Sequence, residues 1–258
     1  MKKSMIGYPK DFKELLANEQ WKDHYIGLGN PNAKILIVGK ECAINTKSNK
    51  EEDIWLNNIT YLQNYQQWKN NSDNNIMEVD KWNPEDIYYD YNLYNPLHPF
   101  YGQLFKPLRT KKDGTKNGGT STTWYNYQKL INYYRIRKGI PIDDSCVDFF
   151  RDCFITELNE LCRPNNNNLT STECYDTEMS IRNRFELICI TPYFQSQFDT
   201  VILACGNYID KLLDKTKLMF GNATIICDAP EFGQQNRLRQ LSFNVEDGLL
   251  RNIADRII

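Results

Sequence analysis

The chain has 258 residues, of which 41% are hydrophobic and 13% are aromatic. This composition supports a large buried core and excludes a disordered or collagen-like protein. The 31 basic and 33 acidic residues leave a net charge of -2, so no overall charge attracts the protein to nucleic acid or to membranes. Any DNA binding must therefore come from local patches of positive charge.

The sequence shows neither a membrane helix nor a signal peptide. No run approaches the roughly 20 apolar residues that a membrane helix needs, and the first residues are followed by polar sequence. We therefore expect a cytoplasmic protein without a membrane partner. The length allows one large domain or two small ones. We expect a single domain over residues 1–258, with an insertion at about residues 45–97.

The eight cysteines predict free thiols rather than a disulfide framework. Several lie inside apolar runs, such as Cys205 and Cys227, and are expected to be buried and reduced. No two cysteines have the Cys-x-x-Cys spacing that is typical of zinc and redox sites. We expect neither a metal nor another cofactor.

Four short runs rich in β-branched residues predict strands at residues 34–39, 153–156, 200–206 and 223–227. Their apolarity is continuous, which is typical of strands buried on both faces. Helical patterns lie between them, at residues 124–137, 180–194 and 209–219. This order predicts an α/β protein with three α/β/α layers around a central, mostly parallel four-stranded sheet. Ligands of such sheets bind beyond the carboxyl ends of the strands, here at residues 40–45, 157–163, 206–207 and 228–235.

The long connection between the first two strands contains three distinct segments. Residues 51–68 carry large apolar side chains at near-helical spacing and predict a helix. Residues 87–94 are rich in tyrosine and form either a surface loop folded on its own rings or the wall of a pocket. Residues 106–116 concentrate positive charge, including Lys111 and Lys112, in a glycine-containing loop. This segment has two interpretations, a run of solvated charges and a phosphate-binding loop.

Several segments follow one another in the order of a known enzyme family. Residues 29–41 end in Gly39-Lys40-Glu41, where a water-activating motif Gly-Glu-Ala-Pro-Gly or Gly-Gln-Asp-Pro-Tyr would stand. Residues 98–104 are similar to a Pro-Phe-Val-Gly segment with a base-stacking Phe, and residues 154–164 to Tyr-Ile-Thr-Asn-Val-Val-Lys-Cys-Arg-Pro. Residues 191–206 are similar to a helix and strand ending in Val-Ile-Val-Ala-Leu-Gly, and residues 228–231 stand in place of His-Pro-Ser. Together they resemble the uracil-DNA glycosylase superfamily, especially its family 4.

Two departures from this family change what the resemblance implies. Family 4 enzymes hold an iron-sulfur cluster on four cysteines that begin with Cys-x-x-Cys near the N-terminus, but no cysteine here precedes Cys42. We therefore expect no cluster. Ala229 occupies the position of the motif histidine, and His24 and His98 are the only histidines in the chain. The usual histidine-assisted excision of uracil is therefore not expected.

The resemblance assigns roles to residues that follow the predicted strands. Glu41 takes the place of the residue that orients the attacking water and offsets positive charge on the sugar. The alternative is a glutamate at a helix N-terminus. Lys40 is a secondary candidate for phosphate binding. Phe100, followed by Tyr101, is the candidate ring on which a flipped base stacks, and an ordinary core aromatic is the alternative.

The residue that reads the base falls at Glu157 or at Asn159, because the strand is one residue longer than in the family. An ionised Glu157 only accepts hydrogen bonds, which suits the exocyclic amine of cytosine. Asn159 in that position would favour uracil. The Glu157 option, the missing histidine and the insertion together predict a pocket for an amine-bearing or bulkier base, such as a modified cytosine of phage DNA.

A loop after the last strand stands where the superfamily keeps its intercalation loop. It offers an apolar wedge, Phe232 or Leu238, beside two arginines that could grip phosphates. The alternative is an amphipathic helix start with Leu238 in the core. The residues assigned to this motif and to DNA binding are Asp228, Pro230, Glu231, Phe232, Arg237, Leu238 and Arg239, together with Lys111 and Lys112.

The resemblance implies a monofunctional DNA glycosylase that flips a base out of DNA and hydrolyses its N-glycosidic bond, leaving an abasic site. We expect a hydroxymethylated or glucosylated cytosine as substrate, and a role in phage defence or DNA repair. The alternatives are a uracil-DNA glycosylase of base-excision repair, a catalytically inactive nucleic-acid-binding member, and an α/β enzyme acting on a nucleotide or another small molecule. The expected partner is DNA, either single or double stranded. We expect a monomer without an obligate protein partner.

Overall fold

The computed structural model describes most of the chain. The described residues are 7–41, 43–44, 62–84, 94–115, 117–161, 163–164, 170–232, 237–242 and 245–258, with the backbone alone for 43–44 and 163–164. Within these ranges no helix has the length and apolarity to cross a lipid bilayer. The described cysteines are free thiols, and Cys205 is buried as expected, whereas Cys227 is only half-buried and Cys174 is exposed.

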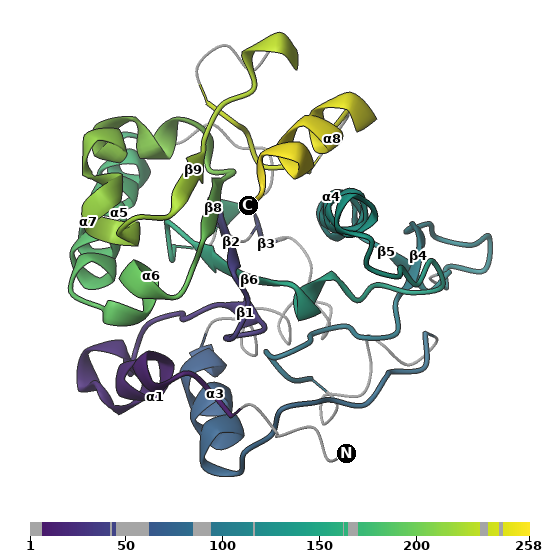
Figure 1. Cartoon of the computed structure of the whole chain (residues 1–258), viewed down its shortest axis with the longest axis horizontal. Helices are drawn as coiled ribbons and strands as arrows, with labels where there is room; N and C mark the ends of the chain where they lie inside the picture. The colour runs from purple at the N-terminus through teal and green to yellow at the C-terminus, as the bar shows by residue number, and fades with distance from the viewer. Residues whose placement is uncertain are drawn as a thin grey trace.

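A five-stranded sheet lies at the centre of the protein (Figure 1). Its order is β1-β6-β2-β8-β9, with β1 at Leu28–Gly29, β2 at Ile35–Gly39, β6 at Cys153–Glu157, β8 at Thr200–Leu203 and β9 at Thr224–Ile226. Strands β6, β2, β8 and β9 run parallel, and β1 pairs with β6 in the antiparallel direction. The predicted α/β protein with a mostly parallel sheet is confirmed. The sheet has five strands rather than four, because β1 extends one edge.

The three central strands are buried along their whole length. Successive side chains point to opposite faces, so that Ile35 and Ile37 join one hydrophobic cluster while Leu36 and Val38 join another. A strand with a core on each face favours apolar residues at successive positions. This is why the middle of each strand is continuously apolar, whereas Thr156, Glu157 and Thr200 stand at strand ends.

Helices cover both faces of the sheet (Figure 1). On one face the core side chains come from α4 (Thr122–Lys138) and α8 (Asp247–Arg256). The opposite face is covered by α1 (Lys10–Ala17), α3 (Asn64–Asp73), α5 (Ser171–Cys189), α6 (Pro192–Ser196) and α7 (Thr216–Phe220). Short 3-10 helices connect these elements: η1 (Glu19–Trp21), η4 (Phe149–Arg151), η5 (Gly206–Lys215) and η6 (Pro230–Phe232).

The predicted helices differ from the observed ones mainly at their ends. The helix expected at residues 124–137 is confirmed as α4. The one expected at residues 180–194 is two helices, because Pro192 cannot continue α5 and instead begins α6. The pattern at residues 209–219 is divided between η5 and α7. Of the helix expected at residues 51–68, only the end coincides with α3, and residues 51–61 lie outside the described part.

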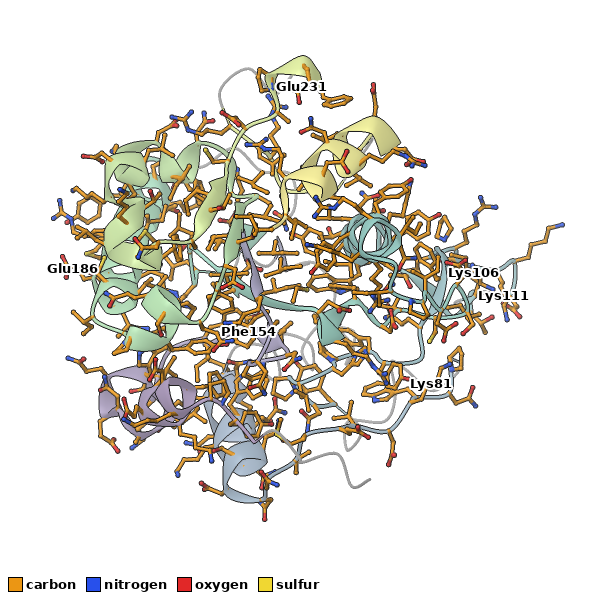
Figure 2. The ribbon with its side chains drawn as sticks, in the orientation of Figure 1. Lys81, Lys106, Lys111, Phe154, Glu186 and Glu231 are labelled. Carbon is orange, nitrogen blue, oxygen red and sulfur yellow. The ribbon has the colours of Figure 1, made fainter. Side chains whose placement is uncertain are left out.

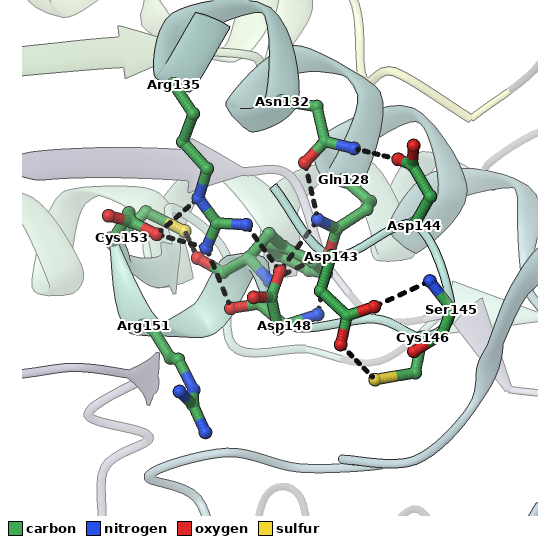
Figure 3. Close-up of polar contacts among 12 residues, drawn as sticks. Gln128, Asn132, Arg135, Asp143, Asp144, Ser145, Cys146, Asp148, Arg151 and Cys153 are labelled. Carbon is green, nitrogen blue, oxygen red and sulfur yellow. Dashed lines mark hydrogen bonds and ion pairs between the residues drawn. The ribbon is translucent and has the colours of Figure 1, made fainter. Parts of the chain in front are cut away.

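A buried polar network fastens α4 to the segment that enters β6 (Figure 3). Gln128 Oε1 accepts from the backbone N–H groups of Asp148 (2.8 Å) and Phe149 (2.9 Å). Arg135, which is almost fully buried, pairs with Asp148 at 2.6 Å and donates from Nε to Asp152 at 2.9 Å. The start of β6 is therefore fixed by hydrogen bonds as well as by the core.

Two small sheets extend the fold. The strands β3 (Ala43–Ile44) and β7 (Arg163–Pro164) pair in parallel, joining the segments that follow β2 and β6. The strands β4 (Leu104–Pro107) and β5 (Gly119–Thr120) form a lobe at the right edge of Figure 1, which carries the basic loop. The tyrosine-rich segment at residues 87–94 lies, apart from Tyr94, outside the described residues.

Candidate active site at the carboxyl ends of β2 and β6

The topology of the parallel strands marks one end of the sheet as the place for a ligand. From β2 the chain crosses to β6 on one side and then to β8 on the other, so the connections leave the centre of the sheet in opposite directions. Such a switch point opens a crevice at the carboxyl ends of the strands. Here the β2–β6 pairing continues past the strands, with Leu158 N donating to Gly39 O at 3.0 Å and Asn159 N to Lys40 O at 2.8 Å. The side chains that follow both strands are thereby held next to one another.

Glu157 is the last residue of β6, and its carboxyl group is buried, with 8% of the residue exposed. Its Oε2 atom has no hydrogen-bond partner within the described part of the chain. Gly39 makes room for it, because a Cβ atom on Gly39 would lie 2.5 Å from that oxygen. Burial, helped by the nearby charge of Glu41 and only partly opposed by Arg184, raises the pKa of Glu157 to about 8. Glu157 is therefore protonated at neutral pH.

Protonation changes what Glu157 can recognise. A carboxylic acid both donates and accepts a hydrogen bond. The expectation from the sequence, an acceptor-only carboxylate that selects the amine of cytosine, assumed an ionised side chain. Burial overturns that assumption, so hydrogen bonding by Glu157 alone does not separate cytosine from uracil.

Asn159 and Glu41 are in direct contact. Asn159 is fully buried, and its Nδ2 atom donates to Glu41 Oε2 at 3.2 Å and to Leu161 O at 3.4 Å, while its Oδ1 accepts from Leu161 N at 3.0 Å. Its amide is thus engaged in a local turn and in orienting Glu41. Glu41 is half-buried and stands between β2 and β3, so the alternative of a helix N-terminal glutamate is wrong. The structure brings Glu41, Glu157 and Asn159 together.

Lys40 covers the end of the neighbouring strand β8. Its Nζ atom lies 4.7 Å from the centroid of the Tyr208 ring, a cation–π contact. Gly206 opens η5 with a φ of 58°, and a Cβ atom there would lie 3.2 Å from Lys40 Cε. Glycine therefore serves both the backbone turn and the close approach of the lysine. An ammonium group is held at the switch point between β2 and β8.

A buried arginine that the sequence did not reveal holds the end of β6. Arg184 of α5 is 1% exposed. It donates to Thr156 Oγ1 at 2.7 Å, to Glu157 O at 3.2 Å and to Glu160 Oε1 at 2.9 Å. Its guanidinium lies 4.8 Å from the Trp21 ring centroid. The fork of Arg184 thus positions the strand residue that carries the protonated carboxyl group.

Glu160 joins this arginine to one of the two histidines. Its carboxylate accepts from Tyr25 N at 2.9 Å and lies 2.6 Å from His24 Nδ1. Burial alone would raise the pKa of Glu160, but the charge of Arg184 and the bonds from His24 and Tyr25 hold it below its usual range. His24 and Glu160 line a cavity of about 220 Å³ with Lys22 and Tyr65. This histidine therefore lies close to the end of β6, although it is remote in sequence from the family motif.

Phe100 occupies a core position. The residue is 6% exposed, has a left-handed φ of 57°, and packs edge-on against Trp82 and Tyr94 at centroid distances of 6.1 and 6.0 Å. The alternative of a core aromatic describes this arrangement. Phe100 would have to leave its neighbours in order to stack on a base.

Tyr101 lies at the other end of β6 from Glu157. Its ring stacks on His98 at 4.2 Å, and its hydroxyl accepts from Arg151 Nη2 at 2.9 Å. Arg151 ends η4, which precedes β6, whereas Glu157 ends β6. The structure therefore does not bring Tyr101 together with Glu41, Glu157 and Asn159.

The segment after β9 is tied to the body of the protein at both ends. Asp228 O accepts from Arg256 Nη1 at 2.7 Å, and its carboxylate pairs with Arg256 Nη2 at 3.2 Å. Arg237 Nε pairs with Asp210 Oδ1 at 2.6 Å. Pro230 and Glu231 are exposed in η6, which projects at the top of Figure 2. Residues 233–236 lie outside the described part.

The two apolar candidates of this loop differ in burial. Leu238 is fully buried in the core, and its backbone bonds to Cys227 O at 2.7 Å and to Gly206 N at 3.0 Å. Phe232 is only partly buried and packs on Gly248 of α8. An apolar wedge from this loop would therefore have to be Phe232. Arg239 is exposed.

Replacing Gly39 with alanine tests the packing of the two strand ends. The new Cβ atom would meet Glu157 Oε2 at 2.5 Å, so the carboxyl group has to move. We expect a loss of about 1–3 kcal/mol in the free energy of unfolding, measured by urea denaturation. In a Glu157→Ala background the same substitution should cost much less, because the two positions are coupled. Equal costs in both backgrounds would contradict the contact.

Comparison with known proteins finds no matching family model, no matching curated protein and no matching solved structure. The resemblance to the uracil-DNA glycosylase superfamily therefore stays a prediction from the sequence. Within the described residues, no group of three or more His, Cys, Asp and Glu side chains is arranged to hold a metal ion. The described residues of the site offer carboxyl, amide and ammonium groups.

Proposed function

We propose that the protein is a DNA glycosylase that hydrolyses the N-glycosidic bond of a base. One observation carries the proposal. Glu41 and the buried Glu157 stand at the ends of adjacent parallel strands, and Asn159 donates a hydrogen bond to Glu41. Most glycoside hydrolases use two such carboxyl groups in different protonation states. The parallel strand order and the helices on both faces support a three-layer fold like that of the uracil-DNA glycosylase superfamily.

The two carboxyl groups divide the reaction between them. Water attacks C1′ of the sugar while the bond from C1′ to the base breaks, which leaves positive charge on the sugar in the transition state. Glu41 orients the water, accepts its proton and stabilises that charge. Glu157, protonated because its pKa is about 8, gives its proton to the departing base. Exchange of both protons with solvent then restores the starting state.

This division of roles favours a cytosine-type base. Ala229 is fully buried, and its methyl side chain cannot donate a hydrogen bond to the carbonyl oxygen of a departing uracil anion. Cytosine and its 5-substituted derivatives accept a proton on the ring nitrogen N3 and can leave as neutral bases. A hydroxymethylated or glucosylated cytosine of phage DNA is therefore the substrate class that we propose, with phage defence or repair as the setting.

Base release from defined DNA tests the proposal. Duplexes carrying uracil, cytosine, hydroxymethylcytosine or glucosylated hydroxymethylcytosine are incubated with the protein, and abasic sites are measured by alkaline cleavage. We expect release of one base by the wild type and a rate about 100-fold or more lower for Glu41→Gln. Glu78→Gln, an exposed glutamate, is the matched control and should keep the full rate. No release from any duplex, or equal rates for both variants, would refute the proposal.

The core position of Phe100 favours a second candidate, a hydrolase of free nucleosides or nucleotides. Such an enzyme would need no ring for a flipped base. The same assay with free nucleosides and nucleotides, followed by chromatography of the released base, separates the two. Release from the free compounds without release from DNA would support this second candidate.

A further inference from the structure

Between Leu104 and Thr115, strand β4 and the loop that follows it carry four basic residues and one acidic residue. The whole protein has a net charge of -2, so this loop differs sharply from the rest of the chain. Lys106 and Lys111 point outward from the lobe at the right edge of Figure 2. All four cations are exposed: Lys106, Arg109, Lys111 and Lys112.

These four cations differ from many others in the protein in that no described carboxylate forms an ion pair with them. Elsewhere, Lys34, Lys129 and Lys211 pair with aspartate or glutamate. No ion pair joins the four loop cations to a carboxylate within the described residues. The one acid of the loop, Asp113, accepts hydrogen bonds from Thr115 N at 3.0 Å and Thr115 Oγ1 at 2.7 Å, and these bonds together with the charge of Lys111 lower its pKa.

Hydrogen bonds hold the loop between the parallel strands β4 and β5 in a defined conformation. Asn117 Oδ1 accepts from Arg109 N at 2.9 Å and from Gly119 N at 3.0 Å, and its Nδ2 donates to Pro107 O at 3.1 Å. At the tip, Lys111 N donates to Thr115 O at 2.7 Å. These bonds hold the backbone that carries the cations in place before any partner binds. A preorganised binding element loses less conformational entropy on binding than a flexible one.

The base of the lobe is fastened to the body of the protein. Phe105 of β4 packs on Tyr125 of α4 at a centroid distance of 4.9 Å. Thr120 Oγ1 of β5 donates to Leu104 O at 2.8 Å. The cations are thus presented by a hydrogen-bonded loop on a fixed support, which distinguishes them from a solvated run of charge on a mobile chain.

We infer that this segment, residues 106–115, is a phosphate-binding finger for duplex nucleic acid. Its cations suit phosphate groups, which lysine and arginine bind through charge and hydrogen bonds. It has no aromatic side chain on which the bases of a single strand would stack. Its tip, residues 110–114, has no apolar side chain that would enter a lipid bilayer. The choice of DNA as the nucleic acid rests on the proposed function, whereas the phosphate-binding role rests on the finger itself.

Salt-dependent binding tests this inference without any chemical step. Affinity for a fluorescein-labelled 20-base-pair DNA duplex of unmodified sequence is measured by anisotropy at several salt concentrations. In the finger variant all four cations are replaced by glutamine, and in the control four exposed cations of α1, α4, α5 and α7 are replaced: Lys13, Lys138, Arg182 and Lys217. Circular dichroism and thermal unfolding confirm that both variants are folded.

We expect the slope of log K against log salt to be about 3 to 4 smaller in magnitude for the finger variant than for the wild type, because each phosphate contact contributes about 0.9. Affinity at low salt should fall at least tenfold, and the control should stay within threefold of the wild type. Equal losses in both variants, or an unchanged slope in the finger variant, would overturn the inference. So would a finger variant that loses binding to phosphatidylserine vesicles but not to DNA. Failure of base release with intact finger-dependent binding would refute only the glycosylase proposal.

Discussion

Replacing Arg184 with leucine will lower the free energy of unfolding by about 3–5 kcal/mol at neutral pH, as expected when one partner of a buried ion pair is removed. The side chain is 1% exposed, and its loss leaves Glu160 without a cation and Thr156 Oγ1 and Glu157 O without a donor. Buried groups without partners carry their full desolvation cost. Guanidinium denaturation followed by tryptophan fluorescence measures the effect.

The same helix supplies a control for Arg184. Arg182 is exposed, so its replacement by leucine should change stability by no more than about 0.5 kcal/mol. Removing both charges in Arg184→Leu/Glu160→Leu should recover part of the loss, since no carboxylate is then left partly buried without its cation. Similar losses for Arg182→Leu and Arg184→Leu would show that the hydrogen-bond fork does not hold the end of β6.

The second large effect is a dependence of stability on pH that originates at Glu157. Its pKa is about 8 in the folded protein, above the value of roughly 4.3 for an unperturbed glutamate. Between these values the folded protein binds a proton that the unfolded chain does not. The stability associated with this proton is therefore fully present below about pH 4 and is lost as the pH rises through 8. The loss is on the order of 5 kcal/mol across that range.

Glu157→Gln isolates this contribution, because glutamine resembles the protonated acid and does not titrate. Urea denaturation at pH 5, 7 and 9 should show wild-type stability falling relative to the variant as the pH rises. Glu78→Gln, at an exposed position, should follow the wild type throughout. Parallel pH curves for the wild type and Glu157→Gln would mean that the carboxyl group ionises normally in the folded protein.

The sequence predicts the centre of the sheet better than its edge. The strands β2, β6, β8 and β9 lie in apolar runs, since a core on each face favours apolar side chains, and their polar residues, such as Thr156, Glu157 and Thr200, stand at strand ends. The edge strand β1 has two residues, Leu28 and Gly29, and a pattern of that length carries no periodicity. Its position depends on the backbone of β6, which sequence reasoning does not supply.

The site divides in a similar way. Glu41, Glu157 and Asn159 are found because they directly follow strands whose carboxyl ends must meet. The network of His24, Glu160 and Arg184 is not, because its members come from a loop, a strand end and a helix and share no spacing. An arginine in a helix is ordinarily expected at the surface. Only tertiary packing turns Arg184 inward.

Ring chemistry alone also fails to predict the place of an aromatic residue. Phe100 has the same side chain whether it stacks on a base or fills a core. Its observed position depends on Trp82 and Tyr94, which approach it from elsewhere in the chain. The protonation of Glu157 is hidden for the same reason, since it depends on burial rather than on neighbours in sequence.

The strand order also constrains how the chain can fold during synthesis. In β2, Ile35 lies opposite Cys153 of β6 and Thr200 of β8. A nascent chain that ends before Cys153 therefore holds β2 without either parallel neighbour, and only the helices α1, α3 and α4 are present to cover Leu36 and Ile37. Parallel pairing across so long a stretch is intrinsically slow, and unpaired apolar strands attract other chains. The protein is therefore expected to fold only after most of its length has left the ribosome, and to depend on chaperones until then.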